Sequence, residues 1–185
     1  MALFHERGYA DVTVAEIAHR AGLTKRTFFN HFSDKREVLF AGATSFEVSV
    51  IQHLSESGDD LTPIDAAVGA LTLSGLELAR YRTFAQVRRE LIASSPELQE
   101  RDLIKMTSLA AAIAQALSQR HVSSRTATLT AQAALAVFNT AYVDWVDDPA
   151  ADLDTLMQRA LADLRLAVVA TVAPAEAAAG KGAGR

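Results

Sequence analysis

Apolar residues near the amino terminus recur at the spacing of amphipathic helices. The first segment places them three or four positions apart, at Val14, Ile17, Ala18 and Ala21. Gly22 follows, and a glycine there allows the left-handed backbone that ends a helix. Phe28 and Phe32 then share one side of a second segment. The pattern therefore predicts two short helices joined by a tight turn between residues 13 and 32.

The rest of the chain shows helical spacing between clear helix breakers. Thr62 with Pro63 offers an N-cap followed by proline at the first helical position, and Pro149 interrupts a later apolar run. No strand-like alternation stands out, so the chain is predicted to be all-α. Six further helices are expected: from an Asp34 cap to about Ser57, from Thr62 to near Arg80, over 83–93, from Ser95 to about Arg120, from Ser123 or Ser124 to near Trp145, and from Asp152 onward.

Hydrogen-bonding side chains stand where the two short helices should begin. Thr13 is a suitable N-cap, and Glu16, three residues on, can reach back to the Thr13 amide. Thr24 is the corresponding N-cap of the second helix, which places residues 25–27 in its first turn. A short helix, a tight turn and a second helix with a basic, polar first turn is the arrangement that enters a major groove. The segment is therefore predicted to be a DNA-binding helix-turn-helix.

The second helix of this motif separates its side chains by role. At about 100° per residue, Arg26, Thr27 and Asn30 point away from the two phenylalanines that face inward. Arginine can read guanine, asparagine can read adenine, and the threonine methyl can contact thymine. Lys35, in the first turn of the next predicted helix, is expected to clamp a phosphate. The predicted DNA contacts are Thr13, Thr24, Lys25, Arg26, Thr27, Phe29, Asn30, His31 and Lys35.

The net charge of −4 is unevenly divided along the chain. Residues 1–40 carry six Lys/Arg and five Asp/Glu, whereas the remaining residues carry twelve and seventeen. Within residues 24–36, four basic residues stand against one acidic residue. The acidity therefore lies in the second region, and the local field over the predicted motif is basic, as DNA binding requires.

A set of motifs covers residues 2–40. They are an LF-x-x-x-GY lead-in from Leu3, a T-V-x-x-I-A segment from Thr13, an A-G-L turn, and a T-F-F-x-H-F-x-x-K segment that ends at Lys35. Together they resemble the DNA-binding domain of the TetR (tetracycline-repressor-like) family of one-component regulators. Phe29 stands where family members often carry a tyrosine that binds phosphate. The family's first helix is normally longer, so we expect a truncated, frayed first helix here, with Met1 inside it.

The resemblance implies a division of the chain and a set of partners. Residues 1–45 would form the DNA-binding domain and residues 46–173 a helical domain for effector binding and dimerisation. The tail over 174–185, rich in Ala, Gly and Lys, is expected to be disordered. The implied partners are double-stranded operator DNA, a small hydrophobic effector and a second copy of the chain. The implied activity is that of a repressor that the effector releases from its operator.

Residues 88–101 read R-R-E-L-I-x-x-S-P-E-L-x-x-R and resemble a mycofactocin-regulator-like subgroup of that family. The resemblance implies a hydrophobic, acyl or acyl-CoA-like effector. Arginines nearby could bind its anionic head, because a guanidinium pairs with carboxylate or phosphate through two hydrogen bonds. Glu77 and Glu90 favour the alternative, a solvated face of salt bridges. The candidate ligand residues are Leu71, Arg80, Arg82, Phe84, Arg88 and Arg89.

The last two predicted helices are apolar over a wide face and rich in small residues. A face that wide needs more cover than one chain supplies, so a homodimer is expected, with two DNA-binding domains on two half-sites. The alternative is that these helices complete a monomeric core. Aromatic residues here are assigned to packing in preference to a ligand cage. The candidate dimer residues are Leu135, Phe138, Tyr142, Trp145 and Leu161.

Several other classes of function lack their sequence features. The chain has no cysteine, and its five histidines are scattered without a His-Glu-x-x-His pair, so no metal site, cofactor or enzymatic activity is predicted. Phosphate-binding loops and nucleophile motifs are absent. No apolar run has the length of a membrane span and no signal peptide precedes the motif, so a cytoplasmic location is expected. The remaining alternative is a helical ligand-binding or interaction protein that does not bind DNA.

Overall fold

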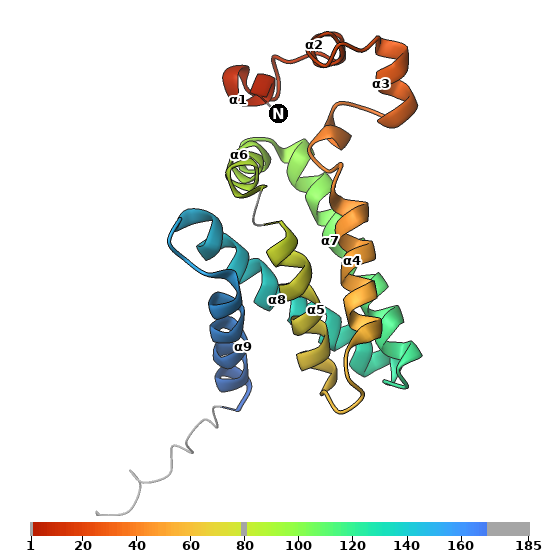
Figure 1. The fold of residues 1–185 in the computed structure, drawn as a ribbon, viewed down its shortest axis with the longest axis vertical. Helices are drawn as coiled ribbons and strands as arrows, with labels where there is room; N and C mark the ends of the chain where they lie inside the picture. Colours follow the sequence, from red (N-terminus) through yellow and green to blue (C-terminus); the bar gives the residue numbers. More distant parts are fainter. Residues whose placement is uncertain (1, 79–80, 170–185) are drawn as a thin grey trace, which may run out of the picture.

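The computed structural model describes residues 2–78 and 81–169, and all regular secondary structure in these ranges is helical. Helices α1 to α3 and the 3-10 helix η1 form an amino-terminal domain at one end, and α4 to α9 form the body (Figure 1). The helices are α1 (Ala2–Arg7), α2 (Val14–Arg20), α3 (Lys25–His31), η1 (Arg36–Val38), α4 (Ala43–Glu56), α5 (Pro63–Glu77), α6 (Arg82–Ala93), α7 (Pro96–Gln119), α8 (Ser124–Asp147) and α9 (Leu153–Val169).

The predicted helix-turn-helix is confirmed. Thr13 caps α2 with a complete capping box, in which the Thr13 amide donates to Glu16 Oε2 at 2.9 Å. Gly22 has a φ of +68°, the left-handed conformation expected at the turn. Phe28 is buried on the inner side of α3, and its ring lies 5.2 Å from that of Phe32. The outer side of α3 is thereby left to polar residues and to the exposed Phe29.

The single helix predicted from Asp34 to about Ser57 is wrong. Asp34 Oδ1 does accept the amides of Arg36, at 2.8 Å, and Glu37, at 3.3 Å, but these bonds open only the short η1. The chain then makes a further turn, and α4 begins at Ala43 with Gly42 as its N-cap. A side chain that caps amides two and three residues on is equally compatible with a 3-10 turn, so the cap predicted the start but not the length.

The body is built around α5, which packs against α4, α8 and α9. Its buried side chains are mostly small, and this lets the helices approach closely. At Gly75 an added Cβ atom would lie 2.8 Å from Leu153 Cδ2 and 3.2 Å from a Phe138 ring carbon.

The predicted helix starts at residues 62, 83, 95, 123 or 124, and 152 are each confirmed within one or two residues. No helix in the described ranges combines the length and apolarity of a membrane span.

A second apolar cluster joins the amino-terminal domain to the body. Phe4 from α1 and Leu39 and Phe40 from the turn after η1 pack with Leu91 of α6 and Leu98 of α7. All five are buried, so removing any of them would open a cavity between the two parts. The amino-terminal domain therefore packs on α6 and α7 through a continuous apolar contact.

Three parts of the sequence predictions, concerning Met1, Arg80 and the 174–185 tail, lie outside the described residues.

Candidate nucleic-acid interface

Helix α3 presents a polar outer surface at the end of the molecule. Thr24 caps it by accepting the Thr27 amide at 3.1 Å, which fixes where its first turn begins. Lys25, Arg26 and Asn30 are exposed. A helix N-terminus with exposed arginine and asparagine on one side has the hydrogen-bond donors that guanine and adenine edges accept in a major groove.

Thr27 and Phe29 differ from the other predicted contacts in how they are held. The Thr27 hydroxyl lies 2.9 Å from the Thr24 hydroxyl, and the residue is half-buried. Phe29 is 53% exposed, and its ring meets that of Phe28 edge-on at 5.5 Å. Phe29 has no hydroxyl for a phosphate, so it offers only a ring to DNA. His31, at the end of α3, is exposed.

Lys35 lies differently from the phosphate clamp that the sequence suggested. Its ammonium donates to the carbonyl oxygens of Tyr9 at 2.9 Å, Val12 at 3.1 Å and Ala10 at 3.3 Å. It also sits 4.3 Å from the centre of the Tyr9 ring. An ammonium group has three donors, and these carbonyls occupy all three. In this structure Lys35 therefore binds the segment between α1 and α2.

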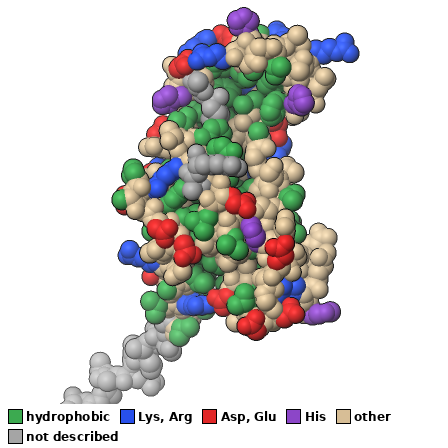
Figure 2. All heavy atoms as spheres, viewed as in Figure 1, with side chains coloured by type: hydrophobic (Ala, Val, Ile, Leu, Met, Phe, Trp, Pro, Cys, Tyr) green, Lys and Arg blue, Asp and Glu red, His purple; other side chains and the backbone are tan. Residues whose placement is uncertain are grey.

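Basic side chains of the amino-terminal domain divide into paired and outward-facing ones. Arg7 bonds Glu16 at 2.6 Å, and Arg20 bonds Glu6 at 3.2 Å. The hydrogen bond from Arg7 is the largest cause that lowers the pKa of Glu16 to about 2. In the face shown in Figure 2, lysine, arginine and histidine side chains gather at the end formed by this domain, while most acidic side chains lie over the body. The positive surface is therefore smaller than the local charge count suggests.

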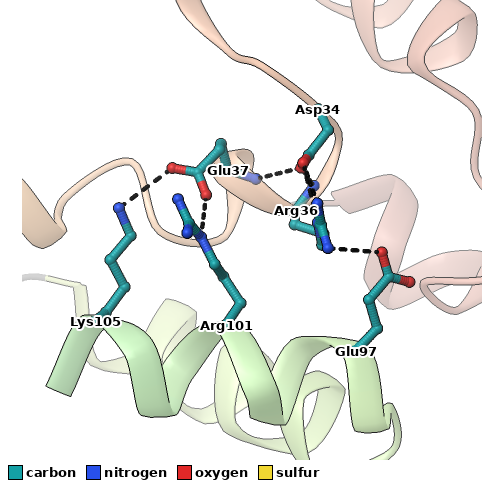
Figure 3. Close-up of polar contacts among 6 residues, drawn as sticks. All are labelled: Asp34, Arg36, Glu37, Glu97, Arg101 and Lys105. Carbon is teal, nitrogen blue, oxygen red and sulfur yellow. Dashed lines mark hydrogen bonds and ion pairs between the residues drawn. The ribbon is translucent and has the colours of Figure 1, made fainter. Parts of the chain in front are cut away.

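A cluster of charged side chains, Asp34, Arg36, Glu37, Glu97, Arg101 and Lys105, joins η1 to α7 (Figure 3). We call it the η1–α7 clasp. Arg101 Nε donates to Glu37 Oε1 at 2.5 Å, and Lys105 Nζ lies 3.3 Å from the other carboxylate oxygen. The hydrogen bond from Arg101 is the first cause that holds the pKa of Glu37 below its ordinary value. Glu37 is thus a half-buried anion shared by two cations of α7.

The other half of the clasp is more open. Arg36, the first residue of η1, bonds Asp34 at 2.6 Å and reaches Glu97, in the first turn of α7, at 3.3 Å. Arg88 adds a third connection from α6, because its Nε donates to the Leu39 carbonyl at 3.1 Å and its Nη2 bonds Asp102 at 2.7 Å. The turn that follows the DNA-binding motif is therefore attached to both α6 and α7.

The residues predicted for the effector site have mostly structural partners. Arg82 donates to backbone carbonyls in the last turn of α8 and in the segment after it, among them Pro149 at 3.1 Å, and its guanidinium lies 4.7 Å from the centre of the Trp145 ring. Arg89 forms a bidentate pair with Asp147. Leu71 is buried in the body's core, and Phe84 is 38% exposed. Arg88 and Arg89 thus pair with aspartates far away in the sequence and not with Glu77 or Glu90, whereas Arg82 binds backbone carbonyls.

The residues predicted for the dimer seam require a correction. Leu135, Phe138, Trp145 and Leu161 are buried within the single chain, and Tyr142 stacks on Phe138 with ring centres 5.6 Å apart. These side chains fill the core between α5, α8 and α9 and do not form a free surface. The large apolar residues that are exposed on the last two helices are instead Leu129, Val143, Leu166, Val168 and Val169.

Sequence reasoning missed the partners on α7. Arg101 and Lys105 stand four residues apart, so both lie on one face of a helix, and Glu37 is more than sixty residues away. The i, i+4 spacing of the two cations was a visible signal for a shared anion, but nothing local identified which anion it was. Two shallow hollows lie on the amino-terminal domain, and neither is lined by a predicted effector residue.

Comparison with known proteins agrees with this architecture. Residues 1–41 match the sequence profile of the bacterial regulatory proteins of the tetR family, and residues 61–169 match that of the MftR C-terminal domain. A Mycobacterium tuberculosis protein described as a mycofactocin biosynthesis transcriptional regulator, MftR, is 26% identical over 155 residues, covering 82% of this chain and 78% of the relative.

A solved structure shares the fold. It is Thermus thermophilus FadR, a TetR family transcriptional repressor in complex with lauroyl-CoA, with a TM-score of 0.58 and 20% identity over 96% of this chain and 95% of FadR. The helix-turn-helix profile covers the domain that carries α3, and the second profile covers more than half of the chain. The chain therefore belongs to the TetR family of bacterial regulatory proteins and has a carboxy-terminal domain of the MftR type.

Proposed function

We propose that the protein is a homodimeric, ligand-responsive transcriptional repressor that acts on DNA in the cytoplasm and has no enzymatic activity. The observation that carries the proposal is α3, whose capped first turn presents Lys25 and Arg26 to solvent, with Asn30 one turn further along. Arg26, Thr27 and Asn30 read bases, while Lys25, His31 and Phe29 contact the flanking backbone.

The direct test of DNA binding is selection from a library of random duplexes with the purified protein, followed by titration of the selected site at several salt concentrations. A dimeric repressor with two DNA-binding domains selects a site with two related halves, and its affinity falls steeply as the salt concentration rises. If no sequence is enriched, the helical protein that does not bind DNA becomes the better explanation.

The second copy is expected to pack on the outer faces of α8 and α9. Leu129 and Val143 of α8 and Leu166 of α9 are exposed, at 66%, 41% and 69%. Ala136 and Ala162 are exposed between them, and such small residues let helix backbones approach closely. This surface replaces the buried residues that the sequence suggested as the seam.

The effector is proposed to be hydrophobic and of acyl type, entering among the middle helices of the body. The support is the lauroyl-CoA carried by FadR, together with the arginines of α6. Arg88 and Arg89 are already bonded to Asp102 and Asp147, so an anionic head that pairs with either guanidinium would meet a carboxylate beside it. Effector binding is therefore expected to compete with these pairs.

The effector proposal is tested by titrating the DNA complex with acyl-CoAs, free fatty acids and neutral apolar compounds of matched length. Arg89→Ala is the informative variant, because Arg88 also bonds the turn after η1 and its loss would disturb the DNA-binding domain directly. Release by anionic compounds from the wild type, and weaker release from Arg89→Ala, is the expected result. Release by neutral compounds alone would assign the arginines to structure.

The η1–α7 clasp is proposed to carry the signal from the body to the DNA-binding domain. A ligand shifts such an equilibrium only as far as it prefers one arrangement, and a preference of about 1.4 kcal/mol per site weakens DNA binding roughly tenfold. Glu37 connects η1 to α7, and Arg88 connects the turn after η1 to α6. A shift of α6 or α7 would therefore move α3 relative to its mate in the dimer.

A further inference from the structure

The η1–α7 clasp contains an ordered series of charges on one face of α7. Glu97, Arg101 and Lys105 stand four residues apart, so they follow one another along the helix surface. The series begins with one anion and continues with two cations. In Figure 3 all three side chains extend from α7 toward the η1 segment.

The η1 segment carries the complementary charges in the matching order. Arg36 Nη1 lies 3.3 Å from Glu97 Oε1. Glu37 accepts from Arg101 Nε at 2.5 Å, and its other oxygen lies 3.3 Å from Lys105 Nζ. A cation of η1 thus meets an anion of α7 at one point, and an anion of η1 meets two cations of α7 at the next.

A slip of η1 along α7 would destroy this match. One helical turn, about 5.4 Å, toward the start of α7 would bring Glu37 to Glu97, and one turn the other way would bring Arg36 to Arg101. Either slip places like charges together, which is unfavourable. Asp34 accepts the amides of Arg36 and Glu37 at 2.8 and 3.3 Å, so the two residues are held together. The clasp therefore accepts one register.

The apolar contact between the amino-terminal domain and the body distinguishes registers less sharply. Phe4, Leu39 and Phe40 pack there with Leu91 and Leu98. Hydrophobic attraction is non-directional and depends mainly on the area removed from water. The order of charges in the clasp therefore supplies the part of the contact that depends on position along α7.

We propose that the charge order of the clasp sets the spacing between the two half-sites that the dimer recognises. The inference rests on the proposed function, a dimer with two DNA-binding domains. The clasp places each domain on its own body, so the separation of the two α3 helices is fixed through α7. A slip of about 5.4 Å exceeds the rise of about 3.4 Å between neighbouring base pairs, so a domain in the wrong register would miss its half-site.

Two variants remove the charge order. Arg101→Met deletes the central charge of the series and keeps an unbranched apolar stem. Glu37→Gln removes the anion that Arg101 and Lys105 share, and it carries the test if Arg101→Met does not fold. Neither substitution alters α3.

Arg120→Met is the matched control. Arg120 is the C-cap of α7 and donates to backbone carbonyls at the far end of α4: Leu54 at 3.2 Å, Ser57 at 2.9 Å and Gly58 at 2.7 Å. Its side chain is 19% exposed, against 30% for Arg101. Its loss is expected to destabilise the body and to leave the clasp in place.

Each protein is titrated with the selected duplex, with duplexes that have one or two base pairs added or removed between the halves, and with a single half-site. The wild type and Arg120→Met are expected to bind about tenfold more weakly when the spacing changes. For Arg101→Met and Glu37→Gln this penalty shrinks to about twofold, while affinity for the single half-site is unchanged. A side chain that only stabilises the fold would leave the ratio between spacings unaltered.

The placement of the amino-terminal domain is measured separately, without DNA. The chain has no cysteine, so cysteines introduced at the exposed His19 of α2 and Gln115 of α7 carry a pair of spin labels. Labelled protein is diluted with unlabelled protein, so that the distance is measured within one chain. The wild type and Arg120→Met are expected to give one narrow distribution of distances, and the two clasp variants a broader one.

A spacing penalty in both clasp variants as large as in the wild type would overturn the proposal. An equal relaxation in Arg120→Met would do so too, because the effect would then follow stability and not the order of charges. Failure of the proposed function has a different result: the wild type selects no sequence with two halves, while the spin-label distances still decide whether the clasp places the domain.

Discussion

Arg26 and Arg36 belong to the same domain but have opposite surroundings. Arg26 extends into solvent from the first turn of α3, whereas Arg36 is bonded to Asp34 at 2.6 Å and to Glu97 at 3.3 Å. An arginine already bonded to carboxylates has few donors left for a new anion. The residue type alone suggests that both arginines could bind DNA. Their neighbours in the structure separate them, because Arg36 is bonded to carboxylates whereas Arg26 is exposed to solvent.

Arg26→Ala is expected to weaken binding to the selected duplex by about 1 to 3 kcal/mol and to affect random DNA far less, because a bidentate contact with guanine is lost. The measurement is the affinity for both duplexes at one salt concentration. Arg125→Ala is the matched control, since Arg125 is exposed at the start of α8 in the body. Equal losses on both duplexes would assign Arg26 to the DNA backbone.

Glu16→Gln is expected to destabilise the amino-terminal domain in a pH-dependent way. The folded pKa of about 2 lies below the ordinary value of 4.5, so the ionised carboxylate favours the folded state. Its contribution is fully present above about pH 5 and is lost as the pH falls from 4.5 through 2. Thermal unfolding of wild type and variant should therefore differ at neutral pH and converge toward pH 2. A difference that persists unchanged at pH 2 would contradict this.

Local signals predicted where most helices begin. Thr13, Thr24, Thr62 and Ser123 each accept the amide three residues on, and that relation lies within one turn of sequence. The prediction of a long helix from Asp34 was wrong because the same capping hydrogen bonds can begin either an α-helix or a 3-10 turn. The partners of the arginines were not predicted, for another reason. Asp147 lies far along the chain from Arg89, and helical periodicity carries no information about such pairs.

A related limit applies to the apolar faces of α8 and α9. A helical wheel shows that Phe138 and Leu161 are apolar, but not whether the surface they meet belongs to the same chain or to a second copy. Both are buried in the core of the single chain, and Gly75 lets the Phe138 ring approach α5 closely. The outer stripe, with Leu129 and Leu166, was thus left out of the predicted seam.

The η1–α7 clasp is expected to stabilise the contact between the domains. Glu37→Gln should lower the free energy of unfolding by about 1 to 3 kcal/mol, because Arg101 and Lys105 lose a shared anion whose side chain is only 18% exposed. Denaturant unfolding measures the change. Glu6→Gln is the control, since its pair with Arg20 is half-exposed and such pairs contribute less than about 1 kcal/mol. Similar losses for both variants would make the clasp an ordinary surface feature.

At the scale of the whole molecule, Leu166→Arg is expected to yield a folded monomer. Leu166 is 69% exposed in the single chain, so the substitution costs the monomer little, whereas a charge buried in an apolar interface is strongly unfavourable. Sedimentation together with thermal unfolding checks both points. Phe138→Ala is the contrasting variant, because Phe138 is buried in the core and its truncation should cost about 3 to 5 kcal/mol of stability. A Leu166→Arg dimer as tight as the wild type would place the interface elsewhere.

The stacking of Arg82 on Trp145 has a practical consequence. Trp145 is the single tryptophan of the chain, is 3% exposed, and lies at the junction of α6 with the end of α8. Its intrinsic fluorescence therefore reports on one place in the body, with no background from a second indole. An effector that displaces the Arg82 guanidinium or admits water changes the emission wavelength and the access of iodide to the ring. Candidate effectors can therefore be screened by the fluorescence of Trp145, without an added label and before the operator sequence is known.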